Sequence, residues 1–227
     1  FLYKKQQLSG SKTLMITSSI SGEGKTFCSI NIATVFALSE KKTVIVGLDL
    51  RKPRLADEFC LTNNQIGVVN YLIRQNTLEE ITNSTQIANL DVILSGPIPP
   101  NPSELILSDA MTEFIEELKQ KYDYIILDTP PVGLVSDSLE LVQYADVTLY
   151  IVRQNYTKKD MITLLNNRIK RGELSNASIV FNGFENKAKY GATYGYGYGY
   201  GAYSNGYHEE EEKSGFLRMI SKVFRKK

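Results

Sequence analysis

The feature that most constrains this chain is a short apolar run that leads into a glycine-rich turn and then into a helical stretch. The run is Leu14–Thr17, and the turn reads Ser18-Ser19-Ile20-Ser21-Gly22-Glu23-Gly24-Lys25-Thr26. This is the G-x-x-x-x-G-K-[ST] motif with Ser19 in place of its first glycine. Because a strand precedes the motif and a helix follows it, the sequence predicts a phosphate-binding loop rather than a surface turn.

The residue types in this turn match the chemistry of binding a nucleotide. Glycines at positions 22 and 24 let successive backbone N–H groups curl around phosphate oxygens, and the following helix points its positive end at the same anion. Lys25 would reach the β- and γ-phosphates, and the Thr26 hydroxyl would hold Mg²⁺. We therefore expect ATP and Mg²⁺ as cofactors. The expected nucleotide-binding residues are Ser21, Gly22, Glu23, Gly24, Lys25, Thr26 and Phe27.

The rest of residues 1–187 alternates between apolar runs and helical stretches. Five further runs lack a period of two and suit strands buried on both faces: Val44–Leu48, Leu90–Leu94, Tyr124–Leu127, Val147–Val152 and Ile179–Phe181. Helical patterns cover Lys25–Leu38, Ser103–Lys121 and Lys158–Arg171. This order predicts an α/β P-loop NTPase fold: a doubly wound, mostly parallel sheet flanked by helices, with its ligand at the carboxyl ends of the strands.

Two of the predicted strands end in an aspartate at that edge. Tyr124–Leu127 runs into Asp128 and then Thr129-Pro130-Pro131, a Walker B pattern that would place the carboxylate near Mg²⁺. The run Val44–Leu48 leads into Asp49, which would lie beside the γ-phosphate. There it would bind Mg²⁺ through water or accept a proton from an incoming hydroxyl.

These patterns assign provisional roles. We expect Lys25, Asp49 and Asp128 to be catalytic, and Thr26, Asp49 and Asp128 to bind the metal. The structural alternative for Asp128 is a turn cap, and for Asp49 it is a salt bridge to Arg51 or Lys52. Arg51 itself would contact phosphate or pair with Asp49.

Two further residues have open interpretations. Asn182 follows the last predicted strand, where related ATPases contact adenine, but Asn182-Gly183 is also a strong turn signal. Cys28 is expected to be a small packed side chain on the first helix rather than a reactive thiol.

Composition excludes several classes of function. The chain has 26 Lys and Arg against 25 Asp and Glu, a formal net charge of +1, which gives no reason to expect a nucleic-acid partner. His208 is the only histidine, so histidine triads and His-rich metal sites are not expected. No apolar run reaches the roughly 18 residues that a spanning helix needs. Two cysteines suit a reducing compartment rather than a disulfide scaffold.

The last part of the chain differs in composition. Residues 188–208 hold seven of the 14 tyrosines, mostly alternating with glycine, which predicts a flexible tail. Those tyrosines are Tyr190, Tyr194, Tyr196, Tyr198, Tyr200, Tyr203 and Tyr207. Residues 209–227 begin with Glu209–Glu212 and continue as a basic segment with an apolar helical face. That segment would lie on an anionic membrane surface, or pack on the domain or a neighbour.

Taken together, the motifs resemble a known family. The relevant stretches are Ser-Gly-Glu-Gly-Lys-Thr (21–26), Leu-Asp-Leu-Arg-Lys-Pro (48–53), Ser-Gly-Pro-Ile-Pro-Pro-Asn-Pro-Ser-Glu-Leu (95–105) and Leu-Asp-Thr-Pro-Pro (127–131), with the tyrosine-rich tail. The chain resembles the cytoplasmic kinase domain of Wzc-like bacterial tyrosine kinases (BY-kinases), which are polysaccharide co-polymerases. The resemblance covers roughly residues 12–207.

The resemblance implies a function and partners. Members transfer the γ-phosphate of ATP to tail tyrosines of a neighbouring copy, and so regulate capsule and exopolysaccharide synthesis and export. Lys25 and Thr26 match the family's Walker A, Asp49 the second aspartate of its Walker A′, and Asp128 its Walker B. The family forms rings that loosen on phosphorylation, and it implies a membrane-spanning region upstream or in a partner, a tyrosine phosphatase, and a place on the cytoplasmic face of the inner membrane.

Two departures keep alternatives open. Walker A′ usually reads Asp-x-Asp, and here Gly47 replaces the first aspartate. The family's N-terminal Glu-x-x-Arg-x-x-Arg assembly motif is also not present. One alternative is a non-catalytic ATP-binding regulator of a polysaccharide-export complex, which Gly47 favours. Another is a ParA- or MinD-like ATPase, although the second lysine that marks those proteins is replaced by Ile20.

Overall fold

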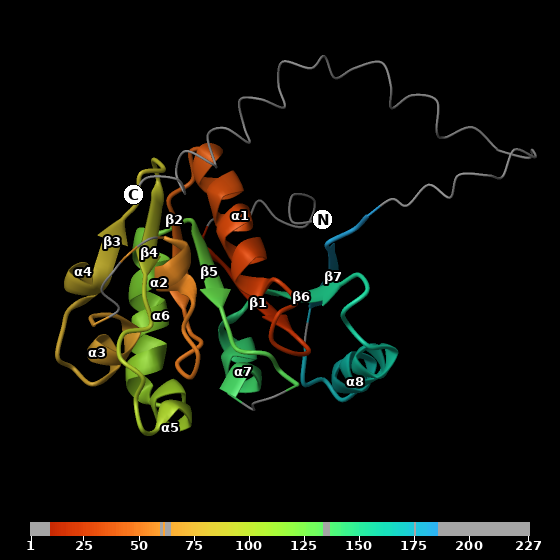
Figure 1. The fold of residues 1–227 in the computed structure, drawn as a ribbon. Coiled ribbons are helices and arrows are strands. Elements are labelled where there is room, and N and C mark those ends of the chain that lie inside the picture. The colour runs from red at the N-terminus through yellow and green to blue at the C-terminus, as the bar shows by residue number, and fades with distance from the viewer. Residues whose placement is uncertain (1–9, 60, 62–64, 134–136, 175, 186–227) are drawn as a thin grey trace, which may run out of the picture. The chain divides into compact units, whose positions relative to one another are not determined.

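The computed structural model describes residues 10–59, 61, 65–133, 137–174 and 176–185. Its centre is a seven-stranded sheet in the order β3-β4-β2-β5-β1-β6-β7 (Figure 1). The strands are β1 (Lys12–Ser18), β2 (Thr43–Gly47), β3 (Thr82–Ser84), β4 (Leu90–Ile93), β5 (Tyr124–Asp128), β6 (Val147–Arg153) and β7 (Ala177–Asn182). All pairs are parallel except β3–β4, so the predicted α/β fold with a mostly parallel sheet is confirmed.

Helices connect the strands. They are α1 (Lys25–Leu38), α2 (Leu55–Glu58), α3 (Val68–Leu72), α4 (Leu78–Ile81), α5 (Pro102–Ile106), α6 (Asp109–Lys121), α7 (Asp137–Glu140), the 3₁₀ turn η1 (Leu141–Tyr144) and α8 (Lys159–Lys170). All six predicted strands and the helices over 25–38 and 158–171 are present, with ends that shift by a few residues.

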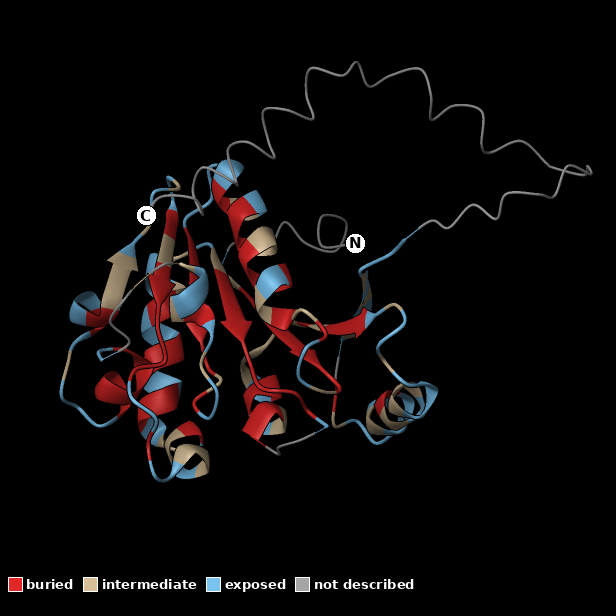
Figure 2. Ribbon diagram, in the orientation of Figure 1, coloured by how far each residue is buried: buried red, intermediate tan, exposed pale blue. Residues whose placement is uncertain are grey.

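The helices cover both faces of the sheet, as a doubly wound fold requires. Leu14 of β1 lies beside α1, whereas the next residue, Met15, joins a large apolar cluster with Phe114 and Leu118 of α6. Alternate residues of one strand therefore pack against helices on opposite faces of the sheet. Figure 2 shows the central strands buried along their length, whereas α8 is mostly intermediate or exposed.

The strand register brings the carboxyl ends together. Ile16 of β1 and Gly47 of β2 both pair with Asp128, the last residue of β5. The turn after β1 and the segment after β2 therefore emerge on either side of Asp128. This edge is where a parallel sheet places its ligand.

The expectation of one helix over Ser103–Lys121 is wrong. The segment forms α5, with Pro102 at its start and Asn101 as N-cap, and then α6, whose N-cap is Ser108. The two helices separate at Leu107, so Ser103 lies inside α5 instead of capping a helix. The antiparallel strand β3 and the short helices α2, α3, α4 and α7 have patterns too short for periodicity to show.

Glu185–Lys227 separates from Phe1–Phe184 as a second unit, of which the structure describes Glu185. The seven tail tyrosines, the expected divisions near residues 187 and 208, and the amphipathic end lie outside the described residues. Within the described part of the chain, none of the helices has the length and apolar character needed to cross a bilayer.

Candidate nucleotide-binding and phosphoryl-transfer site

The turn from β1 to α1 has the backbone that a phosphate loop needs. Gly22 and Gly24 have φ angles of +89° and +92°, values that favour glycine. Gly24 is the N-cap of α1, and Lys25 is its first residue. Ser19, which replaces the first glycine of the motif, is fully buried, and its hydroxyl lies 2.8 Å from that of Tyr150 in β6. A serine here therefore anchors the base of the loop to β6.

Thr26 and Asp128 meet at the end of β5. The Thr26 hydroxyl donates to Asp128 Oδ2 at 2.9 Å, and the Ser29 hydroxyl donates to Oδ1 at 3.0 Å. Asp128 is only 4% exposed. Burial raises its pKa to about 6, although the bonds from Thr26 and Ser29 and the charge of Lys25 act in the opposite direction. The sequence did not predict Ser29, one helical turn after Lys25.

Lys25 lies in the same buried pocket and is 9% exposed. Burial lowers the pKa of its ammonium group, while the carboxylates of Asp128, Asp49 and Glu23 raise it. An ammonium group with little hydration and carboxylates nearby is suited to neutralise phosphate charge.

Asp49 lies just past the end of β2 and is partly buried. Its carboxylate oxygen Oδ1 accepts backbone N–H bonds from Lys52 at 2.9 Å and from Arg51 at 3.3 Å. These bonds fix the turn that follows β2, and both of them use Oδ1 rather than the other carboxylate oxygen, Oδ2. Of the two alternatives for Arg51, a salt bridge with the Asp49 side chain is not observed among the described residues.

The Arg51 guanidinium instead binds Asp137 at the start of α7. Its Nε donates to Oδ2 at 2.8 Å and its Nη2 to Oδ1 at 3.3 Å. Ser103 of α5 donates to the same carboxylate at 2.8 Å. Asp137 is 2% exposed, and burial raises its pKa while Arg51 and Ser103 lower it, with a net lowering. This network ties the segment after β2 to helices α5 and α7. Sequence reasoning missed Asp137 because it lies outside every motif.

The site can be tested for its fit to Mg²⁺. Thr26 offers a hydroxyl and Asp128 a carboxylate, both oxygen donors of the kind that Mg²⁺ prefers. Among the described residues, no group of three or more His, Cys, Asp or Glu is gathered as a metal site. A cation held by one or two protein oxygens together with nucleotide phosphates is the arrangement that this donor set fits.

The chain was next compared with known proteins. A family model described as an AAA domain matches residues 11–179, most of the chain. Tyrosine-protein kinase CpsD of Streptococcus agalactiae is 32% identical over 191 residues, which cover 83% of this chain and 81% of that protein. The chain belongs to this family of bacterial tyrosine-protein kinases.

Other bacterial tyrosine kinases are also similar to this chain. Tyrosine-protein kinase YwqD of Bacillus subtilis is 39% identical over 149 residues, or 66% of this chain. The solved kinase domain of the Escherichia coli tyrosine kinase ETK matches with a TM-score of 0.74 and 31% identity, covering 83% of this chain and 73% of that one. The chain spans 62% of the length of YwqD and 24% of the kinase ptk of Acinetobacter johnsonii.

A more distant likeness concerns the fold alone. The septum site-determining protein MinD of Pyrococcus horikoshii matches with a TM-score of 0.60 at 22% identity. The MinD-like alternative therefore shares the P-loop architecture, while the kinase family holds the closer sequence relatives reported above.

The other predicted residues lie around the loop. Asn182 ends β7, and its amide donates to the Glu23 carbonyl at 3.0 Å while its own oxygen accepts from the Gly183 N–H. The Glu23 side chain is fully buried and accepts the Ile20 N–H at 2.9 Å, so it turns into the protein. Phe27 is 62% exposed on α1, and Cys28 is buried there, as expected for a packed side chain.

Proposed function

We propose that the chain is an ATP-dependent tyrosine kinase that phosphorylates the tyrosine cluster of its own C-terminal segment, in trans between copies. The observation that carries the proposal is the cluster of Lys25, Thr26 and Asp128 at the end of β5, with Asp49 just past the end of the neighbouring strand β2. Membership of the kinase family supports the same conclusion.

Each side chain then has a role. The loop N–H groups and Lys25 would bind the β- and γ-phosphates and neutralise charge that develops during transfer. Thr26 and Asp128 would hold Mg²⁺, which would supply positive charge and Lewis acidity at the phosphates. Asp49, with Oδ1 held by the backbone, would accept the proton of the attacking tyrosine hydroxyl through its other oxygen.

The tyrosines of the tail have the chemistry of phosphoryl acceptors. The seven tyrosines of residues 188–208 are separated by small residues, so several could enter one site in turn. Each phosphotyrosine adds about −1.5 to −2 charges, next to Glu209–Glu212. Accumulated charge would repel neighbouring tails, which is a physical reason for an assembled ring to loosen on phosphorylation.

The cellular setting is part of the proposal. We infer that residues 1–187 form the catalytic domain, 188–208 the acceptor tail and 209–227 an end segment. The domain would act with a membrane-spanning co-polymerase region, upstream or in a partner chain, at the cytoplasmic face of the inner membrane, and with a tyrosine phosphatase. Control of capsule or exopolysaccharide synthesis would be the outcome. The names of the relatives support the kinase part of this inference.

A second function is favoured by one observation. Gly47 supplies no carboxylate beside Asp128, so the chain would bind ATP without transferring phosphate and act as a regulator. Phosphate on the tail separates the two functions, because a regulator would never carry it.

The test is the intact mass of the chain after incubation with Mg-ATP. We expect a ladder of single phosphoryl additions that map to Tyr190–Tyr207, and none in Lys25→Met. Lys119→Met is the matched control, since Lys119 pairs with Glu116 on the outer side of α6. An unchanged mass, in this chain and in one extended upstream to supply an assembly segment, would contradict the kinase and leave the regulator.

A further inference from the structure

Three successive carbonyl groups of the phosphate loop each accept a hydrogen bond from a side chain that lies far away in the sequence. The Tyr156 hydroxyl donates to the Ser21 carbonyl at 3.0 Å, and Arg153 Nη1 donates to the Gly22 carbonyl at 2.8 Å. The Asn182 amide donates to the Glu23 carbonyl at 3.0 Å. None of these donors belongs to the loop or to the helix that follows it.

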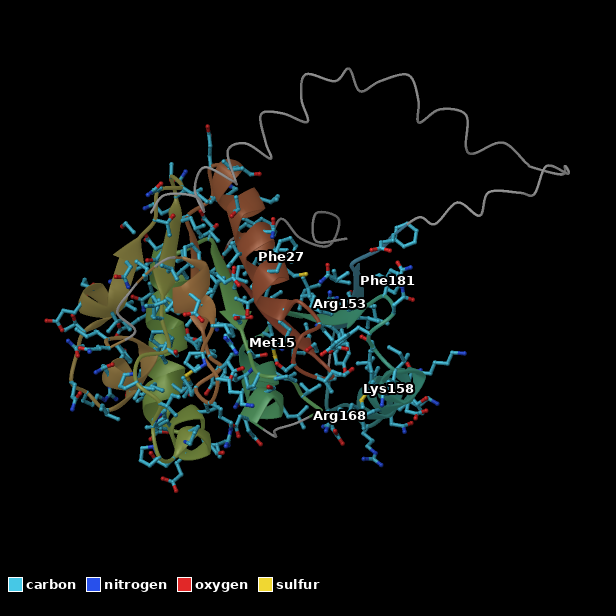
Figure 3. All side chains as sticks on the ribbon, viewed as in Figure 1. Met15, Phe27, Arg153, Lys158, Arg168 and Phe181 are labelled. Atoms are coloured by element: carbon cyan, nitrogen blue, oxygen red, sulfur yellow. The ribbon has the colours of Figure 1, made fainter. Side chains whose placement is uncertain are left out.

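The donors themselves form a connected group. Arg153 ends β6, and its guanidinium lies 5.3 Å from the centre of the Tyr156 ring, a cation–π distance. The Arg153 N–H donates to the Thr157 hydroxyl at 2.9 Å, and that hydroxyl donates in turn to the buried Glu23 carboxylate. Figure 3 shows Arg153 near the end of β6, beside the turn that joins β1 to α1. The segment after β6 thus holds the loop through both backbone and side chain.

Peptide geometry gives these bonds a consequence for anion binding. In a trans peptide the carbonyl of one residue and the N–H of the next point in opposite directions. Holding the carbonyls of residues 21, 22 and 23 on the outer side therefore turns the N–H groups of residues 22, 23 and 24 the other way. Convergent N–H groups bind phosphate, whereas a carbonyl turned inward would repel it.

We propose that Arg153 and Tyr156 are positioning residues for phosphate binding, which act with Asn182 by holding the loop carbonyls outward. They touch the loop and not the reacting atoms. The inference rests on the proposed function only in taking the ligand to be a nucleoside triphosphate. It also assigns Asn182 a contact that is independent of any contact with adenine.

The fit of Gly22 agrees with this role. A Cβ atom on Gly22 would come within 2.5 Å of the Tyr156 hydroxyl oxygen. The absence of a side chain at position 22 therefore gives the tyrosine access to the Ser21 carbonyl. Tyr156 is 45% exposed, so apolar burial alone does not account for its placement.

The experiment compares two ligands by calorimetric titration: ATP and inorganic tripolyphosphate, which has no nucleoside. Tyr156→Phe keeps the ring beneath Arg153 and removes only the hydroxyl, and Arg153→Gln removes the charge-assisted donor. We expect binding to weaken about fivefold for the first and about tenfold for the second, since one neutral hydrogen bond contributes about 1 kcal/mol and a charged one more. The factor should be the same for both ligands.

Two matched controls lie away from the loop. Tyr144→Phe removes a hydroxyl that bonds with Thr112, and Arg74→Gln removes a guanidinium that pairs with Glu113. Neither control should alter either dissociation constant. If Arg153→Gln does not fold, as judged by thermal unfolding, then Tyr156→Phe decides the outcome alone.

Unchanged binding of both ligands in folded Tyr156→Phe and Arg153→Gln would overturn the proposal. So would weaker binding of ATP with unchanged binding of tripolyphosphate, because that pattern indicates a contact with the nucleoside. The readout does not depend on catalysis. A chain that shows the expected losses of binding but never carries phosphate would contradict the kinase and support this inference.

Discussion

The two halves of the sheet are packed very differently. On the β2–β4 side, every residue of β2 is buried, and α6 buries five side chains: Ala110, Met111, Phe114, Ile115 and Leu118. On the β6–β7 side, α8 buries Leu165 among its described residues, and every residue of β7 is intermediate or exposed. Large apolar side chains remain exposed there: Ile169, Ile179, Phe181 and Phe184.

This difference indicates that one half of the sheet contributes mainly to stability and the other to ligand binding. The β2–β4 half supplies more of the apolar burial that stabilises the domain, although Tyr150 and Leu165 of the other half join the same core. The β6–β7 half supplies Arg153, Tyr156 and Asn182, which hold the phosphate loop through polar contacts. Ligand-binding segments commonly belong to the less stable part of a fold, because they must adjust when the ligand binds. We therefore expect substitutions in the first half to change unfolding and those in the second to change binding.

The largest effect should come from opening a cavity in each half. Phe114 is fully buried in the α6 cluster, and we expect Phe114→Ala to cost about 4 kcal/mol in free energy of unfolding. Leu165→Ala should cost about 2 kcal/mol, because α8 buries no other side chain among its described residues and can shift to close the cavity. Urea denaturation measures both. Equal losses in free energy of unfolding would show that the two halves contribute equally to stability, which would contradict this prediction.

Ionisation of the Asp128 carboxyl group should lower the free energy of unfolding as the pH rises. Burial raises the pKa of Asp128 from its ordinary value of 3.8 to about 6, so the unfolded chain ionises first. The stability of the metal-free protein should therefore fall between pH 4 and 6 relative to Asp128→Asn. Since one pKa unit corresponds to about 1.4 kcal/mol, the difference should reach about 3 kcal/mol above pH 6.

The pH dependence, rather than the absolute stability, tests this prediction, because Asp128→Asn also changes the bonds to Thr26 and Ser29. Chemical denaturation in the presence of a chelator at pH 4 and at pH 7 gives the two differences. If the free energies of unfolding of the two proteins change with pH in parallel, burial does not raise the pKa of Asp128.

The strands of the sheet and the residues at their carboxyl ends could be predicted from the sequence. Five of the predicted strands could be found because apolar runs of four to six residues suit a sheet covered on both faces. The sixth run, Ile179–Phe181, does form β7, but the expectation that it is buried on both faces is wrong, because every residue of β7 is intermediate or exposed at the edge of the sheet. Lys25, Thr26 and Asp128 could be placed together because the carboxyl ends of neighbouring parallel strands share one edge. The boundary between α5 and α6 was missed because the apolar spacing continues through Leu107.

The contacts that position the loop could not be predicted. Tyr156 and Ser21 are 135 residues apart, and Arg51 and Asp137 are 86 apart. A tyrosine or an aspartate in a connection carries no periodic signal, and its partner is set by how the elements pack. Arg51 is an example of a side chain whose partner could not be predicted from the sequence. Its sequence neighbour Asp49 was a reasonable partner, but the Asp49 carboxylate bonds to the backbone, and the guanidinium reaches across to α7.

A substitution in the phosphate loop should weaken ATP binding, beyond the cost in stability that a residue other than glycine has at a positive φ. Gly24 has a φ of +92°, and a side chain there would also overlap the Asn182 amide. We expect Gly24→Ala to weaken ATP binding at least tenfold, since either the strain or the lost Asn182 contact disturbs the loop. Gly172→Ala is the control, because Gly172 has a φ of +73° and open space around it. Similar losses of ATP affinity in both variants would contradict a local effect.

The smallest effect concerns Gly47, where the resemblance to the kinase family would lead us to expect an aspartate. Gly47 pairs with Asp128 across neighbouring strands, and a Cβ there would lie 3.3 Å from the Ser95 backbone nitrogen, so a side chain fits after a small shift. Gly47→Asp would place a second carboxylate beside Asp128. Two like charges on adjacent strands repel without a cation and attract one that binds.

We therefore expect Gly47→Asp to make nucleotide binding more dependent on Mg²⁺, with the ratio of ATP affinities with and without the cation rising about fivefold. Gly47→Asn is the matched control, since it has the same shape without the charge and should leave the ratio unchanged. Equal ratios for Asp and Asn would show that position 47 faces away from the metal. In that case Asp49 and Asp128 supply the carboxylates of the site, and the glycine carries no penalty for phosphoryl transfer.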